Sequence, residues 1–341
     1  MTSKIKMLVL SLTGKCNFAC RYCYAAEHER SCMTKATALA ALKLAPKDEN
    51  FILQFSGGEP LLNFKTLQAV VEQVEKEKLP AIMQIQTNAS LITDEMAVYL
   101  YKHKVAIGVS LDGRPRINDK LRLKRNGHGA TGAILKGIEV LRRNNIACGI
   151  TCVVTEENVK ELSGIVEFAS FLGNIRKIGF DILRGQGRGS SLKPPSPQAM
   201  EEAMKNVYAR RDALTRLTGI YIEIAQQERV KKLCRGNCHA FGHCYAMNGE
   251  AAFVDAKGDI YACSSLVGNG DFYLGNVDTG LEQELIKNTQ ALISSSMDFC
   301  RQCPDFALCG GGCFARWYGM AKKEDYGAEC AMKRVSIEQV I

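Results

Sequence analysis

The chain has 341 residues, of which 46% are hydrophobic and 23% charged, and its formal net charge is +8. This composition is ordinary for a globular protein with a core, and no apolar run reaches the roughly 18 residues that a membrane-spanning helix needs. Part of the basic excess lies in Arg114–Arg125 and around Lys231, without a nucleic-acid recognition motif beside it. We therefore expect a solvated basic face, no membrane and no nucleic-acid partner.

The first half of the chain alternates short apolar runs with amphipathic stretches. Six runs rich in Ile, Val and Leu are typical of buried strands, and helical patterns separate them. This alternation predicts an α/β fold of parallel strands joined by crossover helices, here a partial (β/α)6 TIM-like barrel with ligands at the carboxyl ends of its strands. Strands are expected at 4–12, 51–55, 82–87, 105–111, 146–154 and 175–183, and helices at 34–45, 65–78, 94–104, 132–145 and 157–170.

The composition changes after the sixth strand. Gly, Ser and Pro in 185–197 are typical of a linker or surface loop, and a helix is expected from about Gln198 to Leu217. From about Cys234 onward, cysteines, glycines and short strands indicate a small region stabilised by metal. We expect a barrel core at 1–185, a linker and bridging helix at 186–233, and a cluster-binding domain at 234–341.

Fifteen cysteines are the most unusual feature of the composition. The N-terminal stretch MTSKIKMLVLSLTGKC has no small-residue cleavage site, so we interpret it as a strand rather than a signal peptide. Without export, disulfide pairing is not expected, and closely spaced cysteines more often bind metal. The sequence therefore predicts metal sites in a cytoplasmic protein.

Three of the cysteines, Cys16, Cys20 and Cys23, follow the first predicted strand directly. Zinc and iron–sulfur sites usually take four protein ligands, and this Cys-x3-Cys-x2-Cys spacing differs from those of ferredoxins and zinc ribbons. With Tyr24 directly after it, the stretch resembles the signature of the radical S-adenosylmethionine (SAM) enzymes. A structural zinc site is the alternative interpretation.

Three further segments end the second, third and fourth predicted strands and match the same family in this order: Gly57-Gly58-Glu59-Pro60, Thr87-Asn88 and Ser110-Leu111-Asp112-Gly113. Gly-Gly and Asp-Gly pairs usually just make turns, so the order of the segments carries the resemblance. In the family, the Gly-Gly-Glu segment contacts the methionine end of SAM, a serine and an arginine hold its ribose and carboxylate, and the tyrosine borders its adenine through main-chain contacts. The resemblance therefore implies SAM contacts from Tyr24, Gly57, Gly58, Glu59, Thr87, Asn88, Ser110 and Arg122.

The family chemistry explains the missing fourth ligand. Three thiolates hold three irons of a [4Fe-4S] cluster, and the fourth iron binds the amino and carboxylate groups of SAM. An electron from the cluster cleaves SAM to methionine and a 5′-deoxyadenosyl radical, which the protein places beside one hydrogen of the substrate. The resemblance also implies an electron donor such as flavodoxin or ferredoxin.

The C-terminal third carries Cys238-x5-Cys244, then Cys263, then Cys300-x2-Cys303-x5-Cys309-x3-Cys313, and finally Cys330. This series is similar to the seven-cysteine SPASM extension of radical SAM enzymes that modify peptides and proteins, preceded by one extra upstream cysteine. Eight cysteines there suit two fully ligated auxiliary [4Fe-4S] clusters, three clusters in all, although thiolate tetrads also suit zinc. By similarity to the sulfatase maturases, the first auxiliary cluster would bind Cys238, Cys244, Cys263 and Cys313, and the second would bind Cys300, Cys303, Cys309 and Cys330.

Four cysteines remain outside these three sets. Cys148 and Cys152 are four residues apart in a predicted strand and so share a face, where we expect them to act as small buried apolar residues. Cys234 is an alternative ligand of the first auxiliary cluster, and Cys32 has no assigned role.

The sequence departs from related peptide- and protein-modifying enzymes in two respects, and both limit the reactions and substrates that we expect. In sulfatase maturases an Asp thought to act as the base follows the third ligand of the first auxiliary cluster. That position is Ser264 here, and a hydroxyl cannot replace a carboxylate as general base. The first cluster ligand is already residue 16, so we expect no N-terminal leader-recognition domain. A separate leader-peptide-binding protein or the barrel mouth would then recognise a peptide substrate.

We therefore expect an oxidoreductase that abstracts a hydrogen from a residue of a peptide or protein and forms a thioether or carbon–carbon cross-link. The alternatives are sulfatase-maturase-type oxidation of a Cys or Ser side chain, and tailoring of a tetrapyrrole or other small cofactor. A metal-binding scaffold without catalysis is the alternative outside the enzymes. The sequence identifies neither the substrate nor a catalytic base.

Overall fold

The strands of the protein form one curved sheet in the computed structural model, which describes residues 5–236, 244–320 and 326–341. The strand order is β11-β10-β9-β8-β1-β2-β3-β4-β5-β6-β7, so β7 and β11 are the edges and the barrel is not closed. The strands are β1 (Met7–Ser11), β2 (Phe51–Ser56), β3 (Ala81–Thr87), β4 (Ala106–Ser110), β5 (Cys148–Val154), β6 (Ile175–Ile182), β7 (Glu223–Ile224), β8 (Ala251–Val254), β9 (Asp259–Tyr261), β10 (Tyr273–Asn276) and β11 (Gly280–Leu281).

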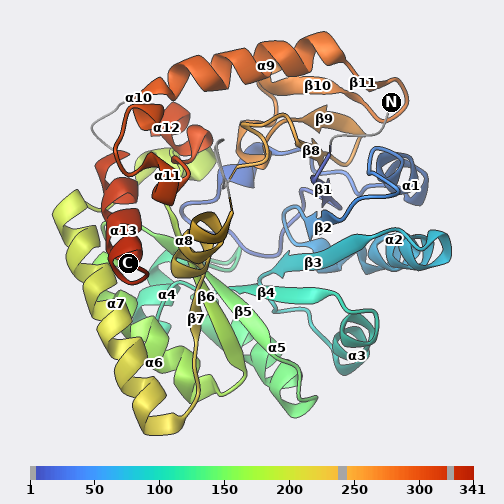
Figure 1. The fold of residues 1–341 in the computed structure, drawn as a ribbon. Coiled ribbons are helices and arrows are strands. Elements are labelled where there is room, and N and C mark those ends of the chain that lie inside the picture. The colour runs from blue at the N-terminus through green and yellow to red at the C-terminus, as the bar shows by residue number, and fades with distance from the viewer. Residues whose placement is uncertain (1–4, 237–243, 321–325) are drawn as a thin grey trace.

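Strands β1 to β6 are parallel neighbours in chain order, which confirms the α/β fold expected from the sequence. The helices that connect them lie around the outside of the curved sheet (Figure 1). The α-helices are α1 (Lys35–Leu42), α2 (Phe64–Glu77), α3 (Asp94–Lys102), α4 (Pro115–Leu121), α5 (Thr131–Arg143), α6 (Leu162–Leu172), α7 (Pro197–Thr218), α8 (Ala225–Arg235), α9 (Gln283–Ser296), α10 (Asp298–Arg301), α11 (Phe306–Cys309), α12 (Phe314–Met320) and α13 (Gly327–Glu338). The 3-10 helices are η1 (Tyr24–Glu27), η2 (Pro60–Asn63), η3 (Val159–Glu161), η4 (Gly187–Ser191), η5 (Ser264–Leu266) and η6 (Gly270–Phe272).

Local sequence signals set the ends of several helices. Thr93 caps α3 by accepting a hydrogen bond from the amide of Met96. Ser196 does the same for α7, with Pro197 in the first turn, and Gly219 ends that helix with a φ of 72°. Helix α4 lies within the basic stretch that the sequence analysis interpreted as a solvated face, and no helix was expected there.

The barrel strands bury one face fully and the other only partly. In β2 the apolar Phe51, Leu53 and Phe55 are buried, and they share the hydrophobic core with α2. The other face carries polar side chains that bond to one another across the strands, because they are shielded from water and need partners. Gln84 donates to Gln54 over 3.0 Å.

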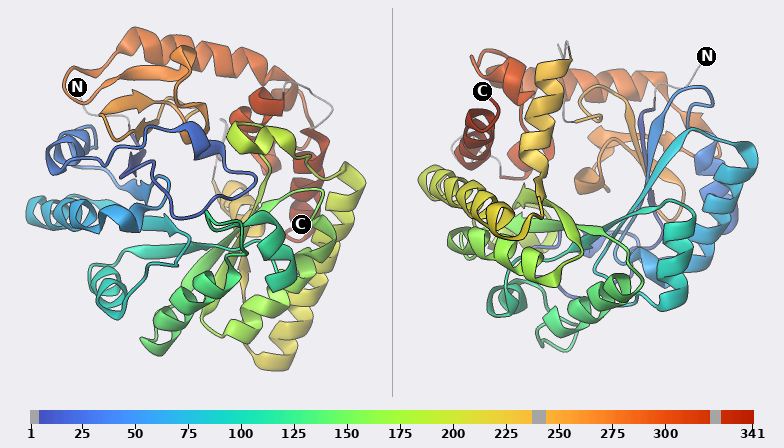
Figure 2. Two further views of the ribbon diagram at one scale, coloured as in Figure 1. Left: turned by 180° about the vertical axis from the view of Figure 1, so that it is seen from behind. Right: turned by 60° about the horizontal axis from the view of Figure 1, so that its bottom comes forward.

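The C-terminal third contributes to both sides of the barrel (Figure 2). Strand β8 pairs with β1 in parallel and extends the sheet through the antiparallel strands β9 and β10. Helix α13 instead packs on α7, where Tyr208 donates to the hydroxyl of Ser336 over 2.9 Å. None of the described helices has both the length and the apolar character that crossing a membrane requires.

Candidate functional site

Cys16, Cys20 and Cys23 lie on the loop that follows β1, at the carboxyl end of the parallel strands. All three are partly buried free thiols, and their side chains interact electrostatically. Burial raises the pKa of Cys16 to about 11 and that of Cys20 to about 12. Metal binding would therefore have to displace protons from these thiols, which is the usual coupling between thiolate ligation and proton release.

The end of β2 approaches this loop closely because two glycines follow it. Gly57 has a φ of 135°, and a Cβ atom there would lie 2.3 Å from the carbonyl oxygen of Thr13. The amide of Gly58 donates to the same carbonyl over 2.7 Å, and the amide of Glu59 donates to the carbonyl of Lys15 over 2.9 Å. Side chains at 57 and 58 would push the two segments apart, so the glycines are required by packing.

The buried Glu59 carboxylate joins the end of β2 to the end of β3. It accepts hydrogen bonds from the Thr87 hydroxyl over 2.6 Å, from the Asn88 amide over 2.8 Å and from the Leu61 amide over 3.1 Å. Burial raises the pKa of this carboxyl, and the three donors act in the opposite direction. The Asn88 side chain then reaches back to the loop, with its Nδ2 3.9 Å from the Cys16 sulfur.

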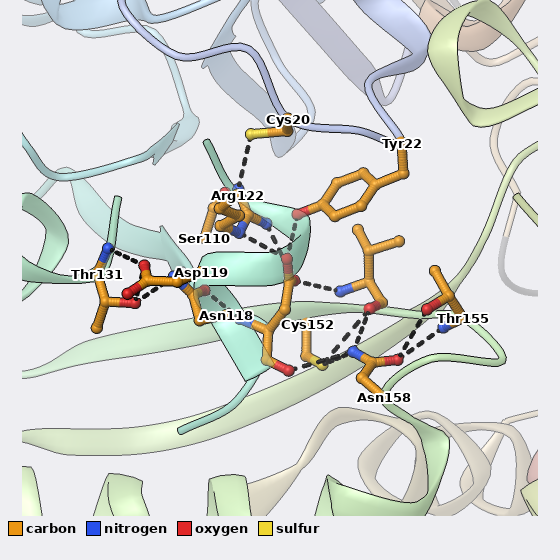
Figure 3. A network of polar contacts seen from close by, with 12 residues as sticks. Cys20, Tyr22, Ser110, Asn118, Asp119, Arg122, Thr131, Cys152, Thr155 and Asn158 are labelled. Atoms are coloured by element: carbon orange, nitrogen blue, oxygen red, sulfur yellow. Dashed lines mark hydrogen bonds and ion pairs between the residues drawn. The ribbon is translucent and has the colours of Figure 1, made fainter. Parts of the chain in front are cut away.

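Ser110 and Arg122 complete the same edge of the sheet from β4 and α4 (Figure 3). The Ser110 hydroxyl accepts a hydrogen bond from Gln86 over 2.9 Å. The Arg122 guanidinium is buried, with its Nε 2.8 Å from Oδ2 of Asp112 and its Nη1 4.0 Å from the Cys20 sulfur. Burial acts to lower the pKa of Arg122, but the Asp112 carboxylate, Tyr22 and Cys20 together outweigh burial, so the pKa is raised.

Tyr24 points its side chain toward the C-terminal third. Its ring lies 5.2 Å below the guanidinium carbon of Arg184, and its hydroxyl is hydrogen-bonded to Ser264. The ring also stacks edge-on against His28, with 5.9 Å between centroids. The side chain of Tyr24 therefore links the cysteine loop to the region around Cys263.

The segment 185–197, whose composition is typical of a linker, packs against the cysteine loop. The amide of Arg188 donates to the carbonyl of Cys23 over 3.1 Å, and its Nε donates to the carbonyl of Cys20 over 2.8 Å. A Cβ atom at Gly187 would lie 2.6 Å from the Cys23 carbonyl oxygen, so only glycine allows this approach. The segment therefore supports the part of the loop that carries Cys20 and Cys23.

Seven of the eight described cysteines from Cys234 onward fall into two sets of mutually interacting thiols. The first set is Cys244, Cys263 and Cys313, and the second is Cys300, Cys303, Cys309 and Cys330. These are the sets expected from the sequence, except that Cys238 lies outside the described residues. Their roles as ligands remain predictions.

The donor chemistry of the three thiols suits an iron–sulfur cluster. Soft thiolates are the usual ligands of a [4Fe-4S] cluster, and each thiolate binds a different iron. Cys16, Cys20 and Cys23 are partly buried free thiols on one loop that hydrogen-bonds to the Gly57–Glu59 segment, so they are donors of the type that such a cluster takes. Among residues 5–236, 244–320 and 326–341, no three His, Cys, Asp or Glu side chains converge closely enough to hold a single metal ion.

The four remaining cysteines lie apart from these sets. Cys148 and Cys152 are buried on the same face of β5, in keeping with a packing role. Cys32 is exposed, with its sulfur 3.6 Å from the hydroxyl of Thr13, and Cys234 is exposed on α8.

A buried ionic network that no sequence pattern predicts joins β6 to the C-terminal helices. Arg316 forms ion pairs with Glu329 and, at 2.7 Å, with Asp181, and it donates to the carbonyl of Ile182 over 3.0 Å. Burial alone would raise the pKa of Glu329, but the charges of Arg316 and Lys333 hold that pKa at about 2. No motif links these positions in sequence, because the partners come together only across the folded chain.

His28 was also missed, and it lines a cavity of about 530 Å³ between the cysteine loop and the β8–β9 region. Its ring packs edge-on against Tyr24 and Phe253 and is hydrogen-bonded to the backbone of Ser264. Burial lowers the pKa of His28 to about 4, so the ring is neutral at pH 7. Four carboxylates and one lysine share the lining of this cavity: Glu27, Glu29, Asp255, Asp259 and Lys257.

Comparison with known proteins places these features in one family. Residues 10–169 match the model of the radical SAM superfamily. An uncharacterized protein of Methanocaldococcus jannaschii, MJ0907, is 34% identical over 283 residues, which are 82% of this chain and 91% of that protein. A cysteine-type anaerobic sulfatase-maturating enzyme of Clostridium novyi is 23% identical over 343 residues, covering 91% of this chain and 87% of the enzyme.

A solved structure has the same fold over almost the whole chain. It is described as native anSMEcpe with bound AdoMet and Cp18Cys peptide, and it covers 98% of this chain and 99% of its own. The TM-score is 0.74 at 20% sequence identity. The likeness confirms the fold, including the part of the chain that carries the C-terminal cysteines.

Proposed function

This chain belongs to the radical SAM superfamily, and from that premise we propose that it modifies a peptide or protein by radical chemistry. It is an enzyme of the radical SAM oxidoreductase type, a class that uses a [4Fe-4S] cluster and SAM. When bound, the two together supply a carbon-centred radical that removes a hydrogen atom from the substrate. The bond that we propose to form afterwards is a thioether or carbon–carbon cross-link.

The observation that carries the proposal is the meeting of three sequence-distant segments at one edge of the sheet. Cys16, Cys20 and Cys23 would hold the cluster, and the Gly57–Glu59 segment hydrogen-bonds to the same loop. Arg122, near Cys20, would bind the SAM carboxylate. Thr87 and Asn88 support Glu59 and Cys16, while Ser110 and Tyr24 would contact the ribose and adenine portions.

Two auxiliary clusters would bring the total to three. The two sets of interacting thiols in the C-terminal third support this count, with Cys238 as the proposed fourth ligand of the first set. A cluster bound only by protein thiolates has no iron free for SAM, which suits electron transfer. Cys244, Cys263 and Cys313, with Cys238, would hold an auxiliary cluster that could take up the electron left after the new bond forms.

The peptide substrate is supported by the relatives. The solved structure of similar fold contains a bound peptide together with AdoMet. We propose a peptide substrate for this chain as well, an electron donor of the flavodoxin or ferredoxin type, and recognition of any leader segment by a separate protein.

Anaerobic reconstitution with iron and sulfide tests the proposal directly. Three [4Fe-4S] clusters correspond to about twelve irons per chain. Incubation with SAM and dithionite should release 5′-deoxyadenosine, and short cysteine-containing peptides encoded beside the gene should lose two hydrogen atoms and show a cross-link on fragmentation. Protein that binds zinc alone and releases no 5′-deoxyadenosine would favour the scaffold interpretation.

Oxidation of a Cys or Ser side chain, as in the sulfatase-maturating relatives, is the second candidate. The observation that favours it is the group around Ser264, where neutral His28 and Tyr24 adjoin the position of the family's proposed base. His28 is neutral at pH 7 because burial lowers its pKa, so a ring nitrogen could accept a proton in place of the aspartate of the family. A sulfatase-derived cysteine peptide that gains an aldehyde, without a cross-link, would select this reaction.

A further inference from the structure

Arg122 and Asp112 form an ion pair that is shut off from water beside the cysteine loop. The Asp112 side chain has no exposed surface, and that of Arg122 is 7% exposed. Burying two charges costs several kcal/mol per ion before their attraction is counted, so such a pair persists only with good geometry and further hydrogen bonds. The surroundings of Asp112 supply those bonds.

The Asp112 carboxylate is saturated with donors. Its Oδ1 accepts from the amide of Val153 over 2.9 Å and from Nη2 of Arg122 over 3.2 Å. Its Oδ2 lies 2.8 Å from Nε of Arg122 and accepts a hydrogen bond from the hydroxyl of Tyr22. The main chain of Asp112 is held as well, since its amide donates to Asn118 over 3.0 Å. The carboxylate therefore has little freedom to turn.

This pairing orients the guanidinium. Arginine presents its donors in a rigid planar fork, so the Nη2 hydrogen bond and the 2.8 Å approach of Nε to the Asp112 carboxylate determine where the remaining edge points. The remaining Nη1 lies 4.0 Å from the sulfur of Cys20, and the ring of Tyr22 lies 5.3 Å from the guanidinium carbon. Figure 3 shows Cys20, Tyr22 and Arg122 gathered at this point.

We infer that Asp112 and Tyr22 are positioning residues that aim the free edge of Arg122 at the carboxylate of SAM beside Cys20. The inference rests on the proposed SAM site and adds two side chains that act on SAM through Arg122. Asp112 holds the fork of Arg122, and Tyr22 holds both partners by its hydroxyl and its ring. Because Tyr22 lies between Cys20 and Cys23 in the chain, the cluster loop and the SAM-binding arginine are placed by one residue.

The ion pair with Asp112 also explains how a charged arginine can be buried beside the cysteine loop. An unpaired buried guanidinium would be unstable, and it would rotate toward whatever acceptor lies nearest. With Asp112 present, the orientation of Arg122 is established before SAM arrives, so less ordering is needed on binding. Loss of the Asp112 carboxylate or of the Tyr22 hydroxyl should therefore weaken SAM binding more than it weakens cluster binding.

The test compares Tyr22→Phe and Asp112→Asn with the wild-type chain after cluster reconstitution. SAM affinity is measured by calorimetry, and the EPR spectrum of the reduced protein is recorded with and without SAM. We expect Tyr22→Phe to weaken SAM binding about threefold and Asp112→Asn about tenfold or more, with iron content unchanged. The SAM-induced change in the EPR spectrum should shrink in the same order.

Asn174→Ala is the matched control. Asn174 is a buried polar residue directly before β6, so it lies at the end of that strand opposite to the site. Its side chain donates hydrogen bonds to the carbonyls of Ile138 and Ile146. The substitution should lower the unfolding temperature of the apoprotein while leaving SAM affinity within twofold of wild type. If Asp112→Asn does not fold, Tyr22→Phe decides alone, since it keeps the ring and removes one hydroxyl.

Wild-type affinity for SAM in folded Tyr22→Phe and Asp112→Asn would overturn the inference while leaving the proposed function intact. A wild-type chain that carries its cluster but binds no SAM would instead overturn the proposed function and this inference with it.

Discussion

The cysteine loop after β1 and the cysteines of the C-terminal third are supported in different ways. The loop is hydrogen-bonded through its main chain to the end of β2 and to the Arg188 segment, both of which adjoin the parallel sheet. The second set of C-terminal thiols lies on and around the short helices α10 and α11 and on α13, away from any described strand. From this difference we expect the first site to be formed by the fold and the second to depend more on any metal that it holds.

The largest expected effect separates the two regions by function. Replacing Cys16, Cys20 and Cys23 together with Ala should reduce SAM cleavage by more than about a thousandfold, because no thiolate then holds the cluster that reduces SAM. The unfolding temperature of the apoprotein should change little. Replacing Cys300 and Cys309 with Ala is the matched comparison, measured by 5′-deoxyadenosine release and iron content. Retained SAM cleavage in the first variant would contradict the assignment of the open cluster.

Removal of metal should loosen the C-terminal region more than the barrel. Hydrogen exchange in α10 and α11 should accelerate at least about tenfold in chelated protein, because these short helices bury little apolar surface of their own. Exchange in β2 and β3 should change much less. Equal acceleration in the barrel strands and the C-terminal helices would show that the two regions do not differ in this respect.

Breaking a buried ion pair of Arg316 tests how strongly the C-terminal helices are attached to the barrel, because Arg316 links Asp181 of β6 to Glu329 of α13. Glu329→Gln leaves Arg316 with only the partly exposed Asp181 as a charge partner and should lower the free energy of unfolding of the apoprotein by up to about 3–5 kcal/mol. Asp94→Asn, which breaks the exposed pair with Arg143, should cost less than about 1 kcal/mol. Urea unfolding measures both, and equal costs would mean that the buried network contributes no more than a surface pair.

The smallest effect concerns His28, at the junction of the two regions. Its pKa is about 4 in the folded chain and close to 6.5 when unfolded, so the unfolded chain binds the proton more tightly. Stability should be full above about pH 6.5 and should fall by up to about 3 kcal/mol as the pH drops through 4.

Urea unfolding of wild type and His28→Gln between pH 7 and pH 4 measures this contribution. The variant lacks the titrating ring, so its stability should depend less on pH over that range. Parallel pH profiles for the two proteins would show that His28 titrates normally in the fold.

The sequence predicted the barrel well because its strands and helices are local patterns. Each buried strand is a short run of Ile, Val and Leu, and each helix repeats its apolar residues with the helical period. Helix α4 was missed because Pro115–Leu121 is short and sits in a basic stretch. The pairing of β8 with β1 was also missed, since 240 residues separate the strands and no local pattern records a long-range partner.

The sequence by itself determined the cysteine spacings, the glycines at 57 and 58 and the family they indicate, because these are features of adjacent residues. Only the tertiary structure decided which polar groups meet: Arg122 with Asp112 and Tyr22, Arg316 with Asp181 and Glu329, and His28 with Ser264. The physical reason is that burial, and with it the strength of a charge pair or the pKa of a ring, depends on atoms contributed by distant parts of the chain.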